Sequence, residues 1–337
     1  MCGGAGGLLR IYERSDDPRE EFRCTKSYRV EGDESSIKQI ALAPSEENLV
    51  CSTLNHMAYT FALGSTDIVE SATDPGFRYF ETLTGSEAHG PSPLVKSAAI
   101  NSMDVCVWKP ILATCGRDQT VRIWNYEEKT MELTKHFKVE PLSVSMHPSG
   151  LFVVVGFVDK VRIMSILMDD LRVVREVSAK ACRECRFSSG GHTIAIAAQS
   201  AVFVVDFYTG AVKFNLRAHQ QAVRSVQWAD KDRKLVTVGK DGNAFLWDAR
   251  TGARIEETMQ PRTAFTTAVL AGDAVSPSSQ LYAVAADNTI KAFGASALAP
   301  DNQVSFVCLF LGRGGIGERG IGRGECLSLF CFIGQYF

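Results

Sequence analysis

A repeated pair of short strands constrains the fold of this chain more than any other feature of its sequence. Residues 111–124 read ILATCGRDQTVRIW and residues 234–247 read KLVTVGKDGNAFLW, so the two segments align without a gap. Each has an apolar strand, a Gly-x-Asp turn and a second strand that alternates apolar and polar residues before a Trp. Such alternation places one face of a strand on a core and the other toward solvent. We expect the glycine before the aspartate to supply the positive φ of a tight hairpin.

Weaker copies extend this repeat over most of the chain. They occupy residues 49–61, 151–164, 193–205 and 280–293, and a lone strand at 8–12 precedes them. From Trp124 onward the copies end about 40 to 46 residues apart, close to the length of a four-stranded propeller blade. Segments 36–45, 141–150, 184–191 and 222–231 fit between the copies, and we expect them to be outer strands. No segment has sustained helical spacing, so the sequence predicts an all-β fold of stacked units.

These intervals predict one β-propeller of about six or seven four-stranded blades over residues 8–295, preceded by a flexible N-terminus at 1–7. A loop insertion rich in Gly, Ser, Thr and Pro is expected at about 64–95. The strand at 8–12 is expected to complete the last blade as a closing strap, which would remove an open sheet edge. Residues 296–337 have neither the repeat nor a helical period, and they are expected to be disordered or translated past an exon boundary.

Composition narrows the classes of partner. The 337 residues carry a net charge of -2, with 45% apolar and 22% charged residues. This balance disfavours a surface that coats nucleic acid, which needs a basic stripe. The longest apolar run, residues 304–311, is too short to cross a bilayer, so no membrane partner is expected. The ten cysteines are scattered, which favours reduced thiols in a cytoplasmic protein.

The strongest repeat resembles the WD40 repeat family. Ala218-His219 stands where that family has Gly-His, and Trp247-Asp248 is the dipeptide that names it. The resemblance implies a non-catalytic, protein-binding propeller whose blades are pinned by a tetrad of loop His, strand hydroxyl, turn Asp and strand Trp. The matching residues are His219, Thr237, Asp241 and Trp247, and in the earlier repeat Thr114, Asp118 and Trp124, with His89 as a looser fourth member. A buried chain of this kind must satisfy its polar groups internally.

Four segments support a narrower resemblance. Residues 109–127, 147–164, 168–172 and 182–192 are similar to the propeller region of cilia- and flagella-associated WD40 proteins. This resemblance implies a scaffold of the ciliary or flagellar axoneme that helps to place or regulate inner dynein arms. Its partners would be axonemal or dynein-arm proteins, with no small-molecule substrate and no cofactor. Such proteins have tandem propellers and a long coiled coil, so we expect this chain to be a fragment of a longer protein.

Three patterns imitate catalytic or binding motifs. Residues 315–320 fit G-x-G-x-x-G, but a dinucleotide site also needs a following helix and a further strand, and too few residues follow. Cys182-x-x-Cys185 has metal-ligand spacing without a second ligand pair, so buried packing is the better interpretation. His219, Thr237 and Asp241 could form a catalytic triad, but a threonine on a central strand is poorly placed to be a nucleophile. The sequence therefore predicts no enzyme.

One alternative function stays open. Residues 247–250, Trp-Asp-Ala-Arg, fit the W-D-x-R motif by which some WD40 proteins resemble substrate receptors of cullin ubiquitin ligases. Asp248 and Arg250 would then contact the ligase adaptor. The same residues also arise wherever a WD strand is followed by a basic turn, and a propeller fold by itself does not decide function. In either case we expect loops on the propeller faces to make the contacts.

Overall fold

A computed structural model describes most of the central part of the chain. Residues 100–260 are described apart from 129 and 230, together with 263–271, 280–286, 289–294 and 304–307. Before residue 100 the described segments are 2–3, 8–14, 22–29, 37–43, 48–53 and 58–62. The predicted insertion at 64–95, His89 and the G-x-G-x-x-G motif lie outside the described residues.

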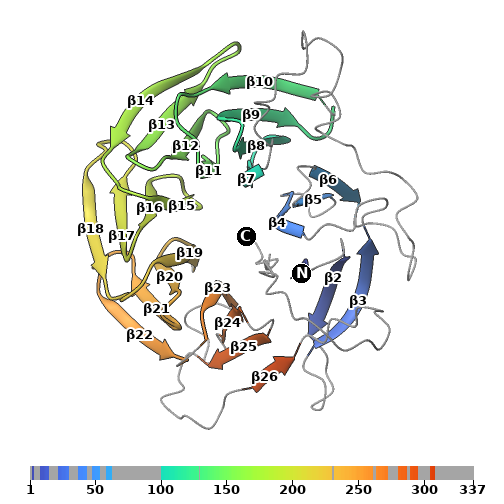
Figure 1. Cartoon of the computed structure of the whole chain (residues 1–337), viewed down its shortest axis with the longest axis vertical. Coiled ribbons are helices and arrows are strands. Elements are labelled where there is room, and N and C mark those ends of the chain that lie inside the picture. Colours follow the sequence, from blue (N-terminus) through green and yellow to red (C-terminus); the bar gives the residue numbers. More distant parts are fainter. Residues whose placement is uncertain are drawn as a thin grey trace, which may run out of the picture.

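The described residues form seven antiparallel sheets arranged around a common axis, each built from consecutive strands (Figure 1). The three-stranded sheets are β1 (Cys2–Gly3), β2 (Leu8–Arg14), β3 (Phe22–Arg29) and β4 (Ile37–Leu42), β5 (Asn48–Thr53), β6 (Ala58–Ala62). The first two four-stranded sheets are β7 (Ile100–Val105), β8 (Ile111–Gly116), β9 (Thr120–Asn125), β10 (Thr130–His136) and β11 (Ser143–Met146), β12 (Phe152–Gly156), β13 (Val161–Ile166), β14 (Leu171–Val177). The next is β15 (Cys182–Phe187), β16 (Thr193–Ala198), β17 (Ala201–Asp206), β18 (Val212–Arg217). The last two are β19 (Val223–Ala229), β20 (Lys234–Gly239), β21 (Asn243–Asp248), β22 (Arg254–Met259) and β23 (Phe265–Ala271), β24 (Gln280–Ala285), β25 (Thr289–Gly294), β26 (Val304–Val307).

This arrangement confirms the predicted all-β propeller. The two strongest sequence repeats are the hairpins β8–β9 and β20–β21, the middle strands of their sheets. Helices are absent from the described part of the chain, which therefore has none able to cross a membrane.

The segments predicted as outer strands are in fact the innermost ones. β4, β11, β15 and β19 lie nearest the axis, whereas β10, β14, β18 and β22 form the periphery (Figure 1). The peripheral strands carry the solvent-exposed residues, as in β14, where the five central residues are all exposed. The polar residues of the inner strands looked like a solvent face in the sequence, but they contact the neighbouring blade instead.

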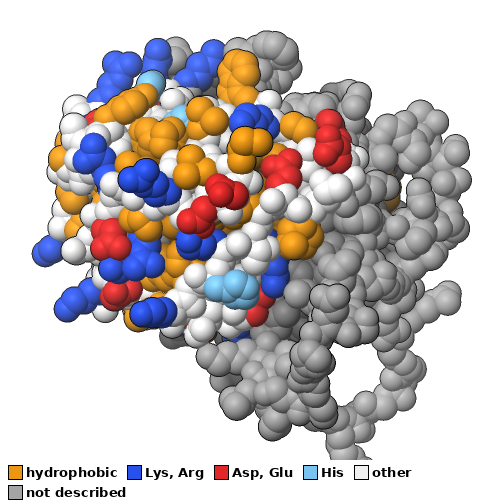
Figure 2. Space-filling model, turned by 90° about the horizontal axis from the view of Figure 1, so that it is seen from above, with side chains coloured by type: hydrophobic (Ala, Val, Ile, Leu, Met, Phe, Trp, Pro, Cys, Tyr) orange, Lys and Arg blue, Asp and Glu red, His pale blue; other side chains and the backbone are white. Residues whose placement is uncertain are grey.

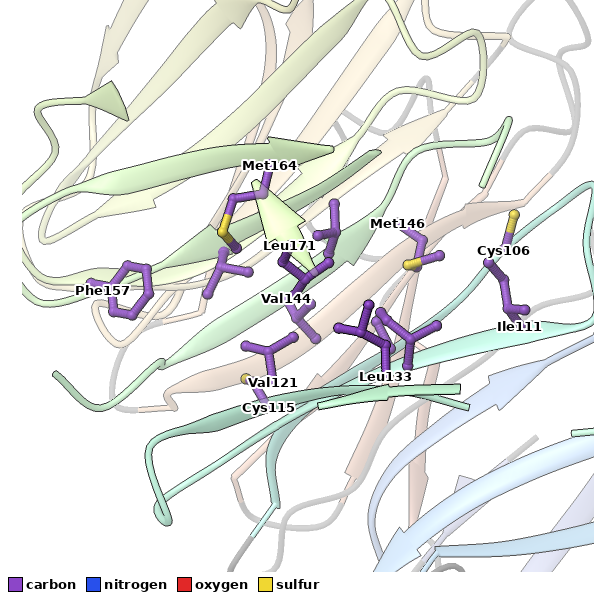
Figure 3. Close-up of a cluster of buried hydrophobic side chains, with 14 residues drawn as sticks. Cys106, Ile111, Cys115, Val121, Leu133, Val144, Met146, Phe157, Met164 and Leu171 are labelled. Atoms are coloured by element: carbon purple, nitrogen blue, oxygen red, sulfur yellow. The ribbon is translucent and has the colours of Figure 1, made fainter. Parts of the chain in front are cut away.

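Hydrophobic side chains from adjacent sheets form the core between blades. Figure 3 shows one such cluster, in which Cys115, Val121 and Leu133 of one sheet face Val144 and Met164 of the next. All five side chains are buried, and burying a side chain of this size contributes about 1.5–3 kcal/mol. A blade thus buries its faces only against its neighbours. The outer rim near β10 and β14 instead intermixes hydrophobic and charged side chains (Figure 2).

Both ends of the predicted domain need correction. Cys2 and Gly3 pair with β2, so residues 1–7 are not wholly a flexible extension. β2 itself lies between β1 and β3, so the strand at 8–12 does not complete the last blade as a strap. The fourth strand of that blade is β26, which pairs with β25. The propeller therefore extends beyond the predicted boundary at 295, into the segment expected to be disordered.

Candidate functional site

A continuous chain of hydrogen bonds crosses the sheet β19–β22. The indole nitrogen of Trp247 donates to Thr237 Oγ1 at 3.0 Å, and Thr237 Oγ1 lies 2.9 Å from His219 Nε2. His219 Nδ1 in turn lies 3.1 Å from both carboxylate oxygens of Asp241. Burial lowers the pKa of His219, and the charge of Asp241 opposes that shift only in part. A neutral His219 that donates from Nδ1 and accepts at Nε2 satisfies every polar group in the chain.

Asp241 also fixes the backbone on both sides of the blade. Its carboxylate accepts hydrogen bonds from the backbone N–H groups of Gln220 at 2.9 Å and Asn243 at 3.2 Å. It thereby ties the connection before β19 to the turn between β20 and β21. Thr237 is fully buried, so its hydroxyl cannot meet a substrate, and the arrangement is structural rather than a nucleophile with its base.

The glycine before the aspartate has a different role from the one predicted. In these two turns the positive φ belongs to the residue after the aspartate, Gln119 at 65° and Gly242 at 76°. Gly239 is instead required for close approach. A Cβ atom at that position would stand 2.6 Å from both His219 Nδ1 and Asp241 Oδ1, too close for either atom to remain in place.

The equivalent residues in the sheet β7–β10 are only partly brought together. Trp124 donates to Thr114 Oγ1 at 2.9 Å, as its counterpart does. Asp118, however, accepts hydrogen bonds from Thr120 Oγ1 at 2.8 Å and from Arg122 at 2.7 Å. The aspartate of this turn therefore neutralises a mostly buried arginine on the next strand. Arg122 is the signal that could have predicted this ion pair, because the other repeat has Phe245 at that position.

A belt of side chains joins the inner strands of successive blades. Each inner strand is a sheet edge, so alternate N–H groups have no partner strand and need another acceptor. Ser143 Oγ accepts from Cys185 N at 2.8 Å, and Glu184 accepts from Val226 N at 2.9 Å. The other members of this inner belt are Gln39, Asp104 and Ser145. Gln39 exchanges two hydrogen bonds with the backbone of Met103. Asp104 accepts from Met146 N, and Ser145 accepts from Phe187 N. The belt therefore replaces the strand pairing that the inner edges lack.

The inner strands β4, β7, β15, β19 and β23 have a β-bulge at their second residue, which explains the Cys-x-x-Cys pattern, whereas the pairing of β11 with β12 is regular. The pairing register shifts around Lys38, Asn101, Arg183, Arg224 and Thr266. A bulge puts residues three apart on the same face, so Cys182 and Cys185 are both fully buried. The hydrogen bond with Cys185 and then burial raise the pKa of Cys182 well above its usual value, so it stays a thiol. Among the described residues no group of three or more His, Cys, Asp or Glu is placed to hold a metal ion.

The largest exposed apolar side chains lie on the loops of one face. Trp108, between β7 and β8, is 79% exposed, and Met168, between β13 and β14, is 99% exposed. Leu151 and Leu167 are also about half exposed on loops of this face, and Ile166 N donates to Leu151 O at 2.8 Å, which brings these two loops together. Exposed apolar residues gathered on loops are typical of protein-binding sites.

Asp248 and Arg250 lie on this same face. Asp248 Oδ1 accepts from the backbone N–H of Arg250 at 2.7 Å, and this hydrogen bond, opposed by slight desolvation, lowers the pKa of the Asp248 carboxyl. The Arg250 side chain is exposed and forms no ion pair with any described residue. Asp248 therefore stabilises the turn through the backbone of Arg250, and the Arg250 guanidinium is left exposed beside it.

Comparison with known proteins places this geometry in a family. The model of the WD domain, G-beta repeat, matches residues 84–125 and 210–248. The chain is a WD40-repeat protein. The two matched regions contain both strands that end in the Trp residues described above, and the second includes the complete hydrogen-bonded chain on Asp241.

This WD40 protein is similar to several curated relatives. Cilia- and flagella-associated protein 57 of Mus musculus is 34% identical over 301 residues, which cover 86% of this chain and 23% of the relative. Cilia- and flagella-associated protein 57 A of Tetrahymena thermophila is 33% identical over 253 residues, 73% of this chain and 18% of the relative. The 77 kDa echinoderm microtubule-associated protein of Lytechinus variegatus is 25% identical over 155 residues, 44% of this chain and 23% of the relative. The chain thus spans less than a quarter of the length of each of these relatives.

Proposed function

We propose that the chain is a non-catalytic, protein-binding scaffold of the ciliary or flagellar axoneme that assists the assembly or regulation of inner dynein arms. The observation that carries the proposal is the 34% identity to mouse cilia- and flagella-associated protein 57 over 86% of this chain. The geometry supports a scaffold as well. Polar groups that resemble catalytic ones, such as Thr237 and His219, are buried and occupied in holding one blade together. The exposed loops are therefore the surfaces available for binding other proteins.

Sedimentation with axonemes tests this proposal. The purified chain is mixed with demembranated axonemes and centrifuged over a range of concentrations. A scaffold of the axoneme enters the pellet in a saturable manner, whereas a chain that stays in the supernatant at every concentration contradicts the proposal. Loss of inner dynein arms from axonemes after deletion of the gene tests the finer part, the link to dynein.

The exposed loop residues allow a sharper version of this experiment. Trp108→Ser combined with Met168→Ser removes the most exposed apolar side chains of one face without touching the core. This double variant is expected to weaken sedimentation about tenfold or more, because exposed aromatic and apolar residues dominate protein interfaces. Met259→Ser is the control, since Met259 is 56% exposed but lies on the peripheral strand β22. Equal effects of the two changes would exclude this loop surface.

A cullin-ligase receptor is the second candidate, and the exposed guanidinium of Arg250 beside Asp248 favours it. In that case the unmodified chain captures a ligase adaptor and Arg250→Ala abolishes the capture. Arg233→Ala is a matched control, because Arg233 is also exposed and its carbonyl accepts a hydrogen bond from Ala249 in the same region. Failure of the unmodified chain to capture the adaptor removes this candidate.

A further inference from the structure

The two faces of the propeller differ in charge. In an up-and-down sheet the turn between the second and third strands lies at the same end as the connection to the next blade. We call this end the tetrad face, because His219 and Asp241 lie on its loops. Its described loop residues are 117–119, 137–142, 157–160, 178–181, 199–200, 218–222, 240–242, 260, 263–264 and 286.

Four cations of the tetrad face are exposed and form no ion pair or hydrogen bond through their side chains with any described residue. Lys138 and Lys180 lie on the connections before β11 and β15, and Lys240 lies on the turn before β21. Arg183 is the bulged residue of β15, which directs it out of the regular ladder. Arg117 adds a fifth exposed cation, 3.9 Å from Glu140. The cations come from four successive blades, so they spread over the face.

The acidic residues of the tetrad face are mostly engaged. Asp241 is buried against His219, and Asp118 is paired with Arg122. Glu140 accepts a hydrogen bond from Asn101 in addition to facing Arg117. Asp159 is the exposed acid of these loops that has no described ion pair. The tetrad face therefore exposes more cationic than acidic side chains, on a chain whose net charge is -2.

The opposite face has no such excess. Its loops carry the exposed cations Lys109, Lys231, Arg233 and Arg250, but they also carry Glu127, Glu128, Asp169 and Asp232. Seen edge-on, the described rim has Lys and Arg side chains along its upper edge, and basic and acidic side chains are mixed below it (Figure 2). The two faces thus differ in exposed charge although the chain as a whole is close to neutral.

We propose that the tetrad face binds an acidic, extended peptide segment of a partner protein, held by Lys138, Lys180, Arg183 and Lys240. This inference rests on the proposed scaffold function and names the class of partner that one face takes. Charge complementarity argues for the acidic occupant, since cations without protein partners are neutralised by an anionic one. A peptide fits better than a nucleic acid because exposed Val139 and Val158 lie among the cations, which do not form a continuous phosphate-tracking stripe. Ala181 N donates to Val158 O at 2.6 Å, which places Lys180 beside this apolar spot.

Binding of a fluorescein-labelled polyglutamate peptide to the full chain tests the proposal by fluorescence anisotropy. One variant reverses the four cations as Lys138→Glu, Lys180→Glu, Arg183→Glu and Lys240→Glu. Its control reverses four exposed cations of the opposite face, Lys109→Glu, Lys231→Glu, Arg233→Glu and Arg250→Glu, so both variants have the same net charge. The tetrad-face variant is expected to lose about tenfold or more in affinity, the sum of several exposed ion pairs. The control is expected to stay within about twofold, and salt should weaken binding by the unmodified chain.

Three results would overturn the inference. These are no binding of the peptide at low salt, equal losses in the two variants, or tighter binding of polydeoxythymidine than of polyglutamate. Sedimentation with axonemes is measured in parallel on the same variants. If the chain still sediments with axonemes but does not bind the peptide, the acidic-peptide site is wrong and the scaffold function stands.

Discussion

At the scale of residues, the sheet β19–β22 depends on a polar chain in which each donor has one acceptor. Thr237 occupies its centre, because its hydroxyl oxygen contacts both His219 Nε2 and the Trp247 indole nitrogen. A buried polar group without a partner costs about 1–3 kcal/mol, whereas a satisfied one contributes only about 1 kcal/mol. The chain therefore specifies one geometry more strongly than it adds stability.

Replacing the central hydroxyl tests this view. Thr237→Val keeps the shape of the side chain but leaves both His219 Nε2 and the Trp247 N–H without their partner. We expect it to lower the free energy of unfolding by about 2–4 kcal/mol, measured by urea denaturation. Thr114→Val is the matched control, because Thr114 accepts a single side-chain hydrogen bond, from Trp124, and should cost about 1 kcal/mol. Equal costs would mean that His219 is not held by Thr237.

Histidine burial predicts a dependence of stability on pH. The rings of Phe152, Phe187 and Phe207 surround His147, and burial lowers its pKa as it does that of His219. Below the ordinary histidine pKa of about 6.5 the unfolded chain binds protons that the folded chain does not. The free energy of unfolding should therefore fall as the pH drops from about 7.5 to 5.5.

A substitution at His147 isolates its share of this effect. Asparagine keeps an acceptor for the backbone N–H of Ser149, which now donates to His147 Nδ1 at 3.1 Å. His147→Asn should flatten the pH profile of the denaturation midpoint, whereas His192→Asn, at an exposed position, should not. An unchanged slope in His147→Asn would show that His147 does not contribute.

The sequence could point to individual residues only where the repeat was complete. His219, Thr237, Asp241 and Trp247 stand at the spacing that one hydrogen-bonded chain requires, and the structure places them within hydrogen-bond distance. In the partial copy Trp124 is joined to Thr114, and Asp118 accepts a hydrogen bond from Arg122, a residue that the complete copy lacks. His89 lies outside the described residues. A role of Asp248 and Arg250 in binding stays a prediction.

At the scale of elements, the inner strands decide how blades are joined. β4, β7, β15, β19 and β23 each carry a bulge at the second residue, whereas the pairing of β11 with β12 is regular. β4, β7, β11 and β15 offer side-chain acceptors to the open edge of the next inner strand. The hydrogen bonds to the acceptors of β7, β11 and β15 join residues 42 positions apart, so each one links equivalent positions in successive blades. The inner belt therefore couples neighbouring blades through their edges, in addition to the apolar packing of their faces.

Asp104 is the residue of the inner belt whose loss should matter most. Its carboxylate accepts from Ser145 Oγ at 2.7 Å and Met146 N at 2.8 Å, and it lies 3.4 Å from Arg186 two blades away. Asp104→Ala should lower the free energy of unfolding by about 1–3 kcal/mol, because the N–H of an inner edge is left without an acceptor. Asp169→Ala, at an exposed turn, should change it by less than about 0.5 kcal/mol. Similar urea midpoints for both variants would show that the inner belt does not stabilise the ring.

Strands were predictable from the sequence, whereas their radial positions were not. Alternation identified the middle hairpins because one face of each strand is buried whatever its place in the sheet. The inner strands were misplaced because their polar residues contact a neighbouring blade, a partner that a single segment does not reveal. The bulges did leave a signal, two polar residues between apolar ones, in IKQI, INSM, CREC and VRSV. That spacing breaks the period of two, and it also explains the Cys-x-x-Cys pattern without a metal.

At the scale of the whole molecule, the ring presents two different faces. One exposes Trp108 and Met168 on its loops, and the other exposes cations without acidic partners. Under the proposed function these faces offer separate contacts, one apolar and one electrostatic, on blades that are joined by their shared core and by the inner belt. Neither face could be distinguished from the sequence, because each gathers loops from blades about 42 residues apart.

The most direct test of this account is the location of the tagged full-length gene product in a ciliated or flagellated cell before and after detergent extraction. The account predicts a signal along the axoneme that persists when membrane and soluble proteins are removed. A diffuse or nuclear signal, lost on extraction, would contradict the axonemal scaffold while leaving the propeller fold intact.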